Sequence, residues 1–158
     1  MARVWILYYS RTGNTEAMAR AVEEGVRKAG GTPVCKPVTD AHASELLEAD
    51  ALILGTPTYY GLPAGPLKTF LDETSAVHGK LEGKVGGAFS TSVHRGGGNE
   101  TAILALLQAM LVHGMVVPGA ARGDHYGPVA LGEPDAAALT QCRELGERIT
   151  RLAERLAG

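Results

Sequence analysis

The chain has little cysteine, no long apolar run and no excess of charge of one sign, and each absence removes a class of function. Cys35 and Cys142 lie far apart in the sequence and belong to no Cys-x-x-Cys or Cys/His cluster. The sequence therefore predicts neither a disulfide framework nor a metal site. Fifteen Lys and Arg against seventeen Asp and Glu give a net charge of −2 without a basic run, which argues against nucleic acid as a partner.

The apolar stretches are too short to span a membrane, and the first residues already form a strand pattern, which leaves no room for a signal peptide. Two unpaired thiols are typical of a reducing compartment. We therefore expect a cytoplasmic protein with no membrane insertion. At 158 residues the chain is expected to form one domain over residues 1–158, large enough to bury about two thirds of its unfolded surface.

The most informative segment is Ser10–Thr15, which follows the apolar run Val4–Tyr9 and precedes a helical pattern. It lacks the lysine of a nucleoside triphosphatase loop and the three spaced glycines of a dinucleotide fingerprint. It also lacks the cysteine of a cysteine-dependent phosphatase, and the strand ends lack the acidic residues of a receiver domain.

The same segment is rich in groups that bind an anion. Four of its side chains offer hydrogen bonds, Gly13 permits a tight turn, and the first backbone amides of the following helix point into the turn. A helix cap would explain one such residue, but the loop has four. The sequence predicts a phosphate site made of hydroxyls and amides, with Arg11 as its one cation.

Apolar runs typical of buried parallel strands alternate with helical patterns along the whole chain. This alternation predicts an α/β fold, a three-layer doubly wound arrangement with a five-stranded parallel sheet and right-handed crossovers. The expected strands are Val4–Tyr9, Pro33–Val38, Ala51–Gly55, Val85–Ser90 and Met115–Val117, and the expected helices are Thr15–Ala29, Asp40–Glu48, Pro66–Glu73, Asn99–His113 and Asp135–Leu156.

Ligands of such a sheet bind beyond the carboxyl ends of the strands, so the loops after the first, third and fourth strands belong together. After the third strand, Pro57 stiffens the chain, and Tyr59 or Tyr60 offers a flat face for a planar heterocycle. Adjacent tyrosines can also simply cover a sheet edge. Their place beside a predicted phosphate loop favours the binding role.

After the fourth strand, the glycines at 96–98 let backbone amides approach a ring edge closely. His94 and Arg95 bring positive charge, which would favour a reduced, anionic ring. A triple glycine can also be only a mobile loop. The combination of the three loops predicts a phosphorylated planar ligand.

The three loops resemble those of the flavodoxin-like superfamily and, within it, the WrbA-type NAD(P)H:quinone oxidoreductases. The resemblance covers nearly the whole chain and is carried by Ser10–Thr15, by 55–61 with 70–74, by 89–91 with the glycine run, and by the His-Gly-Met turn at 113–115. It implies the strand order 2-1-3-4-5, FMN as cofactor, NAD(P)H as co-substrate, a quinone as acceptor, and a homodimer or homotetramer.

The resemblance also implies roles for individual residues. The phosphate would be held by Ser10, Arg11, Thr12, Gly13, Asn14 and Thr15; the ring would be flanked by Pro57, Thr58, Tyr59, Tyr60 and Gly61; and its pyrimidine edge would meet Ser90, Thr91, Ser92, Val93, His94, Arg95, Gly96 and Gly97. His113 is expected to line the flavin pocket. His78 and Tyr126, in two segments that are shorter than in the family, are further substrate-pocket candidates. No side chain is expected to be catalytic.

Three functions follow from this interpretation. The leading one is transfer of two electrons from NAD(P)H to a quinone, with the protein supplying orientation and charge. The second is a flavodoxin-type one-electron carrier, although carriers that dock by charge usually have a stronger single-sign field. The third is a flavin-binding module without turnover.

Overall fold

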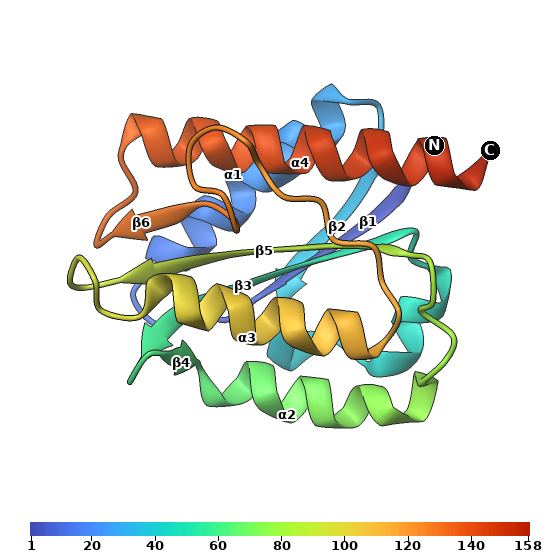
Figure 1. Cartoon of the computed structure of the whole chain (residues 1–158), viewed down its shortest axis with the longest axis horizontal. Coiled ribbons are helices and arrows are strands. Elements are labelled where there is room, and N and C mark those ends of the chain that lie inside the picture. Colours follow the sequence, from blue (N-terminus) through green and yellow to red (C-terminus); the bar gives the residue numbers. More distant parts are fainter.

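The computed structural model places a parallel sheet between two layers of helices (Figure 1). The strands run in the order β2-β1-β3-β5-β6, and a short β4 pairs antiparallel with β3. Counted along the chain, the five parallel strands therefore follow the predicted order 2-1-3-4-5, and the doubly wound α/β prediction is confirmed. The strands are β1 (Arg3–Tyr8), β2 (Thr32–Pro37), β3 (Ala51–Tyr59), β4 (Leu62–Pro63), β5 (Val85–Ser92) and β6 (Val129–Leu131).

The four α-helices are divided evenly between the two faces of the sheet. Figure 1 shows α1 and α4 on one face and α2 and α3 on the other. Side chains alternate along a strand, so Ile6 packs toward α1 and α4 while its neighbour Leu7 packs toward α2 and α3. Each face thus has its own apolar core. The helices are α1 (Asn14–Lys28), α2 (Gly65–Glu73), α3 (Asn99–Val112) and α4 (Ala136–Ala157). No helix combines the length and the apolar character that crossing a membrane requires.

The predicted fifth strand at Met115–Val117 is wrong. Only Val116 reaches the sheet there, as a single bridge to Val85, and Pro118 follows with no amide hydrogen to donate to a ladder. The chain leaves the sheet edge after this bridge and returns as β6, which pairs with the other end of β5 at Ser90–Ser92. The last position in the sheet is therefore correct in order but is occupied by a later, three-residue segment.

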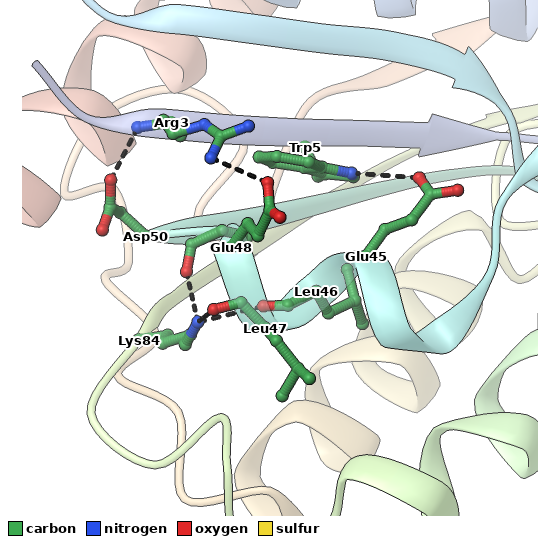
Figure 2. A network of polar contacts seen from close by, with 9 residues as sticks. Arg3, Trp5, Glu45, Leu46, Leu47, Glu48, Asp50 and Lys84 are labelled. Atoms are coloured by element: carbon green, nitrogen blue, oxygen red, sulfur yellow. Dashed lines mark hydrogen bonds and ion pairs between the residues drawn. The ribbon is translucent and has the colours of Figure 1, made fainter.

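The helix predicted at Asp40–Glu48 is also wrong, because the segment forms two short 3-10 helices, η1 (Val38–Asp40) and η2 (Ala43–Glu48). Extended backbone at Ala41 and His42 separates them. Figure 2 shows how Lys84 holds the end of η2: its Nζ donates to the carbonyls of Leu46 (2.9 Å) and Leu47 (3.0 Å). The remaining 3-10 helix, η3 (Thr74–Val77), follows α2 directly.

Candidate functional site

Three loops meet at the carboxyl edge of the sheet because β1, β3 and β5 are adjacent and parallel. We call them loop 1 (residues 10–15), loop 2 (57–61) and loop 3 (90–97). Thr15 Oγ1 and Thr91 Oγ1 lie 2.9 Å apart in a buried contact that joins loop 1 to loop 3. Thr101 Oγ1 lies 2.6 Å from Gly61 O and 2.8 Å from Gly98 O, which ties loop 2 to the end of the glycine run. The three loops therefore form one site.

Loop 1 turns into α1 through Gly13, whose φ of 98° is easy only for glycine. Ser10 Oγ accepts hydrogen bonds from the amides of Gly13 (3.1 Å) and Glu16 (3.2 Å), which fixes the turn. The amides of Asn14 and Thr15 donate to no acceptor in the chain. Two free amides at a helix start, together with exposed Arg11 and Thr12, provide the donors that a phosphate requires.

Loop 2 consists of the last three residues of β3 and the two-residue hairpin turn that leads to β4. Tyr60 and Gly61 both have positive φ, 53° and 75°, as a tight hairpin between twisted strands requires. This conformation is uncommon for a residue other than glycine and leaves the Tyr60 side chain fully exposed at the tip. Tyr59 is 38% exposed beside it, and the buried Thr58 Oγ1 has no hydrogen-bond partner. The loop therefore presents aromatic faces and contains one buried hydroxyl without a hydrogen-bond partner.

Loop 3 is braced by side chains and leaves its backbone amides open. Ser90 Oγ donates to Asn99 O at 2.9 Å, and Asn99 Nδ2 donates to Ser92 Oγ at 3.0 Å. The backbone amides of residues 93–96 donate to no acceptor in the chain. Such amides can meet the polar edge of a heterocycle. Ser90, Thr91 and Ser92 are buried at the end of β5, whereas 93–96 are exposed.

Within a single chain, His78 and His113 lie away from the three loops. His113 follows the last turn of α3, a 14-residue helix that begins beside loop 3, so the helix places it about 21 Å along the molecule. Its Nε2 is 2.8 Å from Thr74 Oγ1, and its ring centroid is 5.6 Å from that of His78. Both histidines line a groove of about 630 Å³ between α2 and α3. The structure therefore brings these two together but not with the loops.

Tyr126 is half exposed in the segment between Val116 and β6. Two residues before it, Asp124 Oδ2 accepts from the amide of Val129 at 2.9 Å, and Asp124 shares a cavity of about 450 Å³ with Arg95 and Asn99. The segment that carries Tyr126 therefore reaches the neighbourhood of loop 3. Sequence reasoning missed Asp124, because it lies in an irregular stretch without a periodic pattern.

The tyrosine and the thiols near the core are not poised for ionisation. Burial and the neighbouring Glu16 raise the pKa of Tyr8 to about 12, and its hydroxyl lies 3.1 Å from Glu16 Oε1. Burial also raises the pKa of the Cys35 and Cys142 thiols to about 12. Both cysteines are therefore protonated near neutral pH and have no thiolate to offer.

Comparison with known proteins identifies the family that carries such a site. Residues 32–126 match the family model described as NADPH-dependent FMN reductase. The chain belongs to this family. A relative named NAD(P)H dehydrogenase (quinone) from Archaeoglobus fulgidus is 30% identical over 99% of the chain and 100% of its own length, and a flavodoxin from Aquifex aeolicus is 39% identical over 94% and 85%.

A solved structure shows the same fold. The flavodoxin, WrbA-like protein from Agrobacterium tumefaciens superposes with a TM-score of 0.82 at 30% identity, over 98% of this chain and 99% of that one. The flavodoxin-like fold and the resemblance to WrbA-type proteins are thereby confirmed. FMN is the cofactor of the family, and the residues present fit it: free amides at loop 1 for a phosphate, aromatic faces at loop 2 and open amides at loop 3.

Proposed function

We propose that this FMN reductase family member transfers two electrons from NAD(P)H to a quinone. The net reaction converts NAD(P)H, a proton and a quinone into NAD(P)⁺ and a hydroquinone. The observation that carries the proposal is the joining of the three loops through Thr15–Thr91 and Thr101–Gly61, because it builds one site for a phosphorylated planar cofactor. Relatives named NAD(P)H dehydrogenase (quinone), 30 to 34% identical over nearly the whole chain, support the reaction class.

Each loop has a task in this proposal. The amides of Asn14 and Thr15, helped by Ser10, Thr12 and Arg11, bind the phosphate. Pro57, Thr58 and the two tyrosines of loop 2 flank the ring. The amides of 93–96 would hold its polar edge, and His94 and Arg95 would place positive charge beside a reduced ring. Bound FMN supplies the redox chemistry, so the chain needs no acid or base of its own.

The two substrates use the same place in turn. Because Tyr60 and Tyr59 of loop 2 are exposed, a ring bound beside them would remain open to solvent, so that a nicotinamide could stack there and leave before the quinone arrives. Tyr126 belongs to the substrate side of this proposal, since its segment lies near loop 3. A homodimer or homotetramer and a cytoplasmic location remain predictions.

A one-electron carrier is the second candidate, because flavodoxins from Aquifex aeolicus and Clostridium saccharobutylicum are 39% and 38% identical to the chain. The net charge of −2 gives little of the single-sign field by which carriers steer toward their partners. Slow anaerobic reduction of the FMN-loaded protein separates the two. Accumulation of a one-electron-reduced species without oxidation of NADH supports the carrier, and steady NADH or NADPH oxidation that depends on added quinone supports the proposal. A yellow protein that does neither is a binding module.

A further inference from the structure

The groove between α2 and α3 is larger than the cavity of about 450 Å³ beside loop 3. Its volume of about 630 Å³ is in the range of small-molecule sites, and much of its wall is apolar, from Leu62, Pro63, Leu71, Ala105, Ala109 and Val112. The function proposed above uses none of these side chains. The groove is therefore a candidate for a second part of the substrate site.

The sequence of α3 creates the groove. The helix is rich in leucine, but Ala105 and Ala109, four residues apart on one helix face, are small where the helix faces α2. Larger side chains at these two positions would fill the space between the helices. The two alanines therefore leave a channel that runs along the helix.

The groove begins at loop 2. Leu62 and Pro63 line the end of the groove nearest loop 2, and they directly follow the Tyr60–Gly61 turn. Thr101 Oγ1 holds Gly61 O at 2.6 Å, so α3 is fixed against the turn one helical turn before Ala105. A molecule whose head lies beside the ring at loop 2 can extend into the groove without leaving the protein surface.

The charges of the groove decide between the two substrates. Its one lysine, Lys68, is 2.7 Å from Asp72 Oδ1, and no arginine lines the wall. The pyrophosphate of NAD(P)H would find no free cation there. The polar groups at the far end are His78 and the hydrogen-bonded pair of Thr74 and His113, not a cluster of lysines or arginines. The apolar wall instead matches an aliphatic chain.

We propose that the groove between α2 and α3 binds the aliphatic side chain of a lipid-type quinone whose ring is reduced at loop 2. This inference rests on the proposed function and names its substrate class. From Ala105 to Val112 the helix rises about 10 Å, which an extended chain of about eight methylene groups spans. A second copy of this chain is a poorer occupant, because it would have to cover Lys68 and Asp72, which are 72% and 66% exposed and mutually paired.

The test compares two quinones with the same ring, one bare and one with a ten-carbon side chain. Each buried methylene favours binding about fourfold when fully covered and less in an open groove. We expect kcat/KM to be at least about thirtyfold higher for the chain-bearing quinone, mainly through KM. In Ala109→Phe, which fills the groove, that advantage falls to below about threefold while the bare quinone is reduced as before. Leu104→Phe, which adds a ring on α3 outside the groove wall, keeps the advantage.

Calorimetric binding of the chain-bearing quinone to the FMN-loaded protein gives a readout that needs no turnover, and it weakens in Ala109→Phe but not in Leu104→Phe. If neither quinone is reduced, the proposed function fails. If the bare quinone is reduced but the side chain brings no gain in the wild type, or the gain survives Ala109→Phe, the groove inference is overturned. It is equally overturned if sedimentation shows that Ala109→Phe changes the oligomeric state, since a second copy then occupies the groove.

Discussion

Thr15 Oγ1 and Thr91 Oγ1 lie 2.9 Å apart and are both buried, so a single hydroxyl contact connects the start of α1 to the end of β5. Removing one partner leaves the other hydroxyl unsatisfied. We expect Thr15→Val and Thr91→Val each to lower the free energy of unfolding by about 1–3 kcal/mol, whereas the double variant loses less than the sum. Urea unfolding of the four proteins measures this coupling.

Thr39→Val, at an exposed threonine without a hydrogen-bond partner, is the control and should change stability by less than about 0.5 kcal/mol. Additive losses in the double variant would show that the two hydroxyls act independently. In that case the contact would not be what holds loop 1 to loop 3.

Gly98 and Gly96 offer a matched pair in loop 3 and the start of α3. Both have positive φ, 95° and 67°, so alanine at either costs about 1–2 kcal/mol of backbone strain. A Cβ at Gly98 would also collide with the backbone of Gly61, whereas one at Gly96 would meet nothing. We expect Gly98→Ala to weaken FMN binding at least about tenfold more than Gly96→Ala, as followed by flavin fluorescence. Equal losses of FMN affinity in the two variants would show that the contact between Gly98 and loop 2 does not contribute to cofactor binding.

The phosphate role of loop 1 is tested by a ligand that lacks the phosphate. Thr12 is exposed and makes no hydrogen bond in the chain, so Thr12→Ala should leave stability nearly unchanged. Its FMN affinity should fall about tenfold, by the loss of one hydrogen bond to a charged group, while riboflavin affinity stays as in the wild type. Equal losses of affinity for FMN and riboflavin would show that Thr12 does not contact the phosphate.

Loop 1 could be predicted from sequence because its chemistry is local: hydroxyls, one glycine and a helix start within six residues. The hydrogen bonds that join the loops could not be predicted from the sequence. Thr101 reads as an ordinary residue in the first turn of a helix, and only the folded chain shows that its hydroxyl reaches Gly61, 40 residues away. The position of His113 could not be predicted from the sequence for a similar reason. The length of α3 places this residue far from loop 3. Strand β6 has three residues, too few for a period to be recognised.

His113 should titrate below the ordinary histidine value of about 6.5, because burial and the nearby His78 lower its pKa. The folded protein then binds this proton less readily than the unfolded chain. The stability contributed by neutral His113 is fully present above about pH 6.5 and is lost as the pH falls toward the lowered value. NMR titration of the histidine ring protons measures the pKa of His113 in the folded protein.

In His78→Ala the pKa of His113 should move back upward, since one cause of its lowering is removed. A His113 that titrates at or above the ordinary histidine value of about 6.5 in the wild type would show that its ring is neither buried nor coupled to His78.

The central claim, that the three loops hold one FMN that connects a nicotinamide to a quinone, is tested most directly by anaerobic absorbance. The apoprotein is loaded with FMN, freed of excess cofactor, reduced with one equivalent of NADH or NADPH, and then given one equivalent of benzoquinone. We predict one FMN per chain, bleaching of the flavin band by the nicotinamide and full return of colour with the quinone. A protein that takes up no FMN, or whose bound flavin stays yellow with both nicotinamides, would contradict the account.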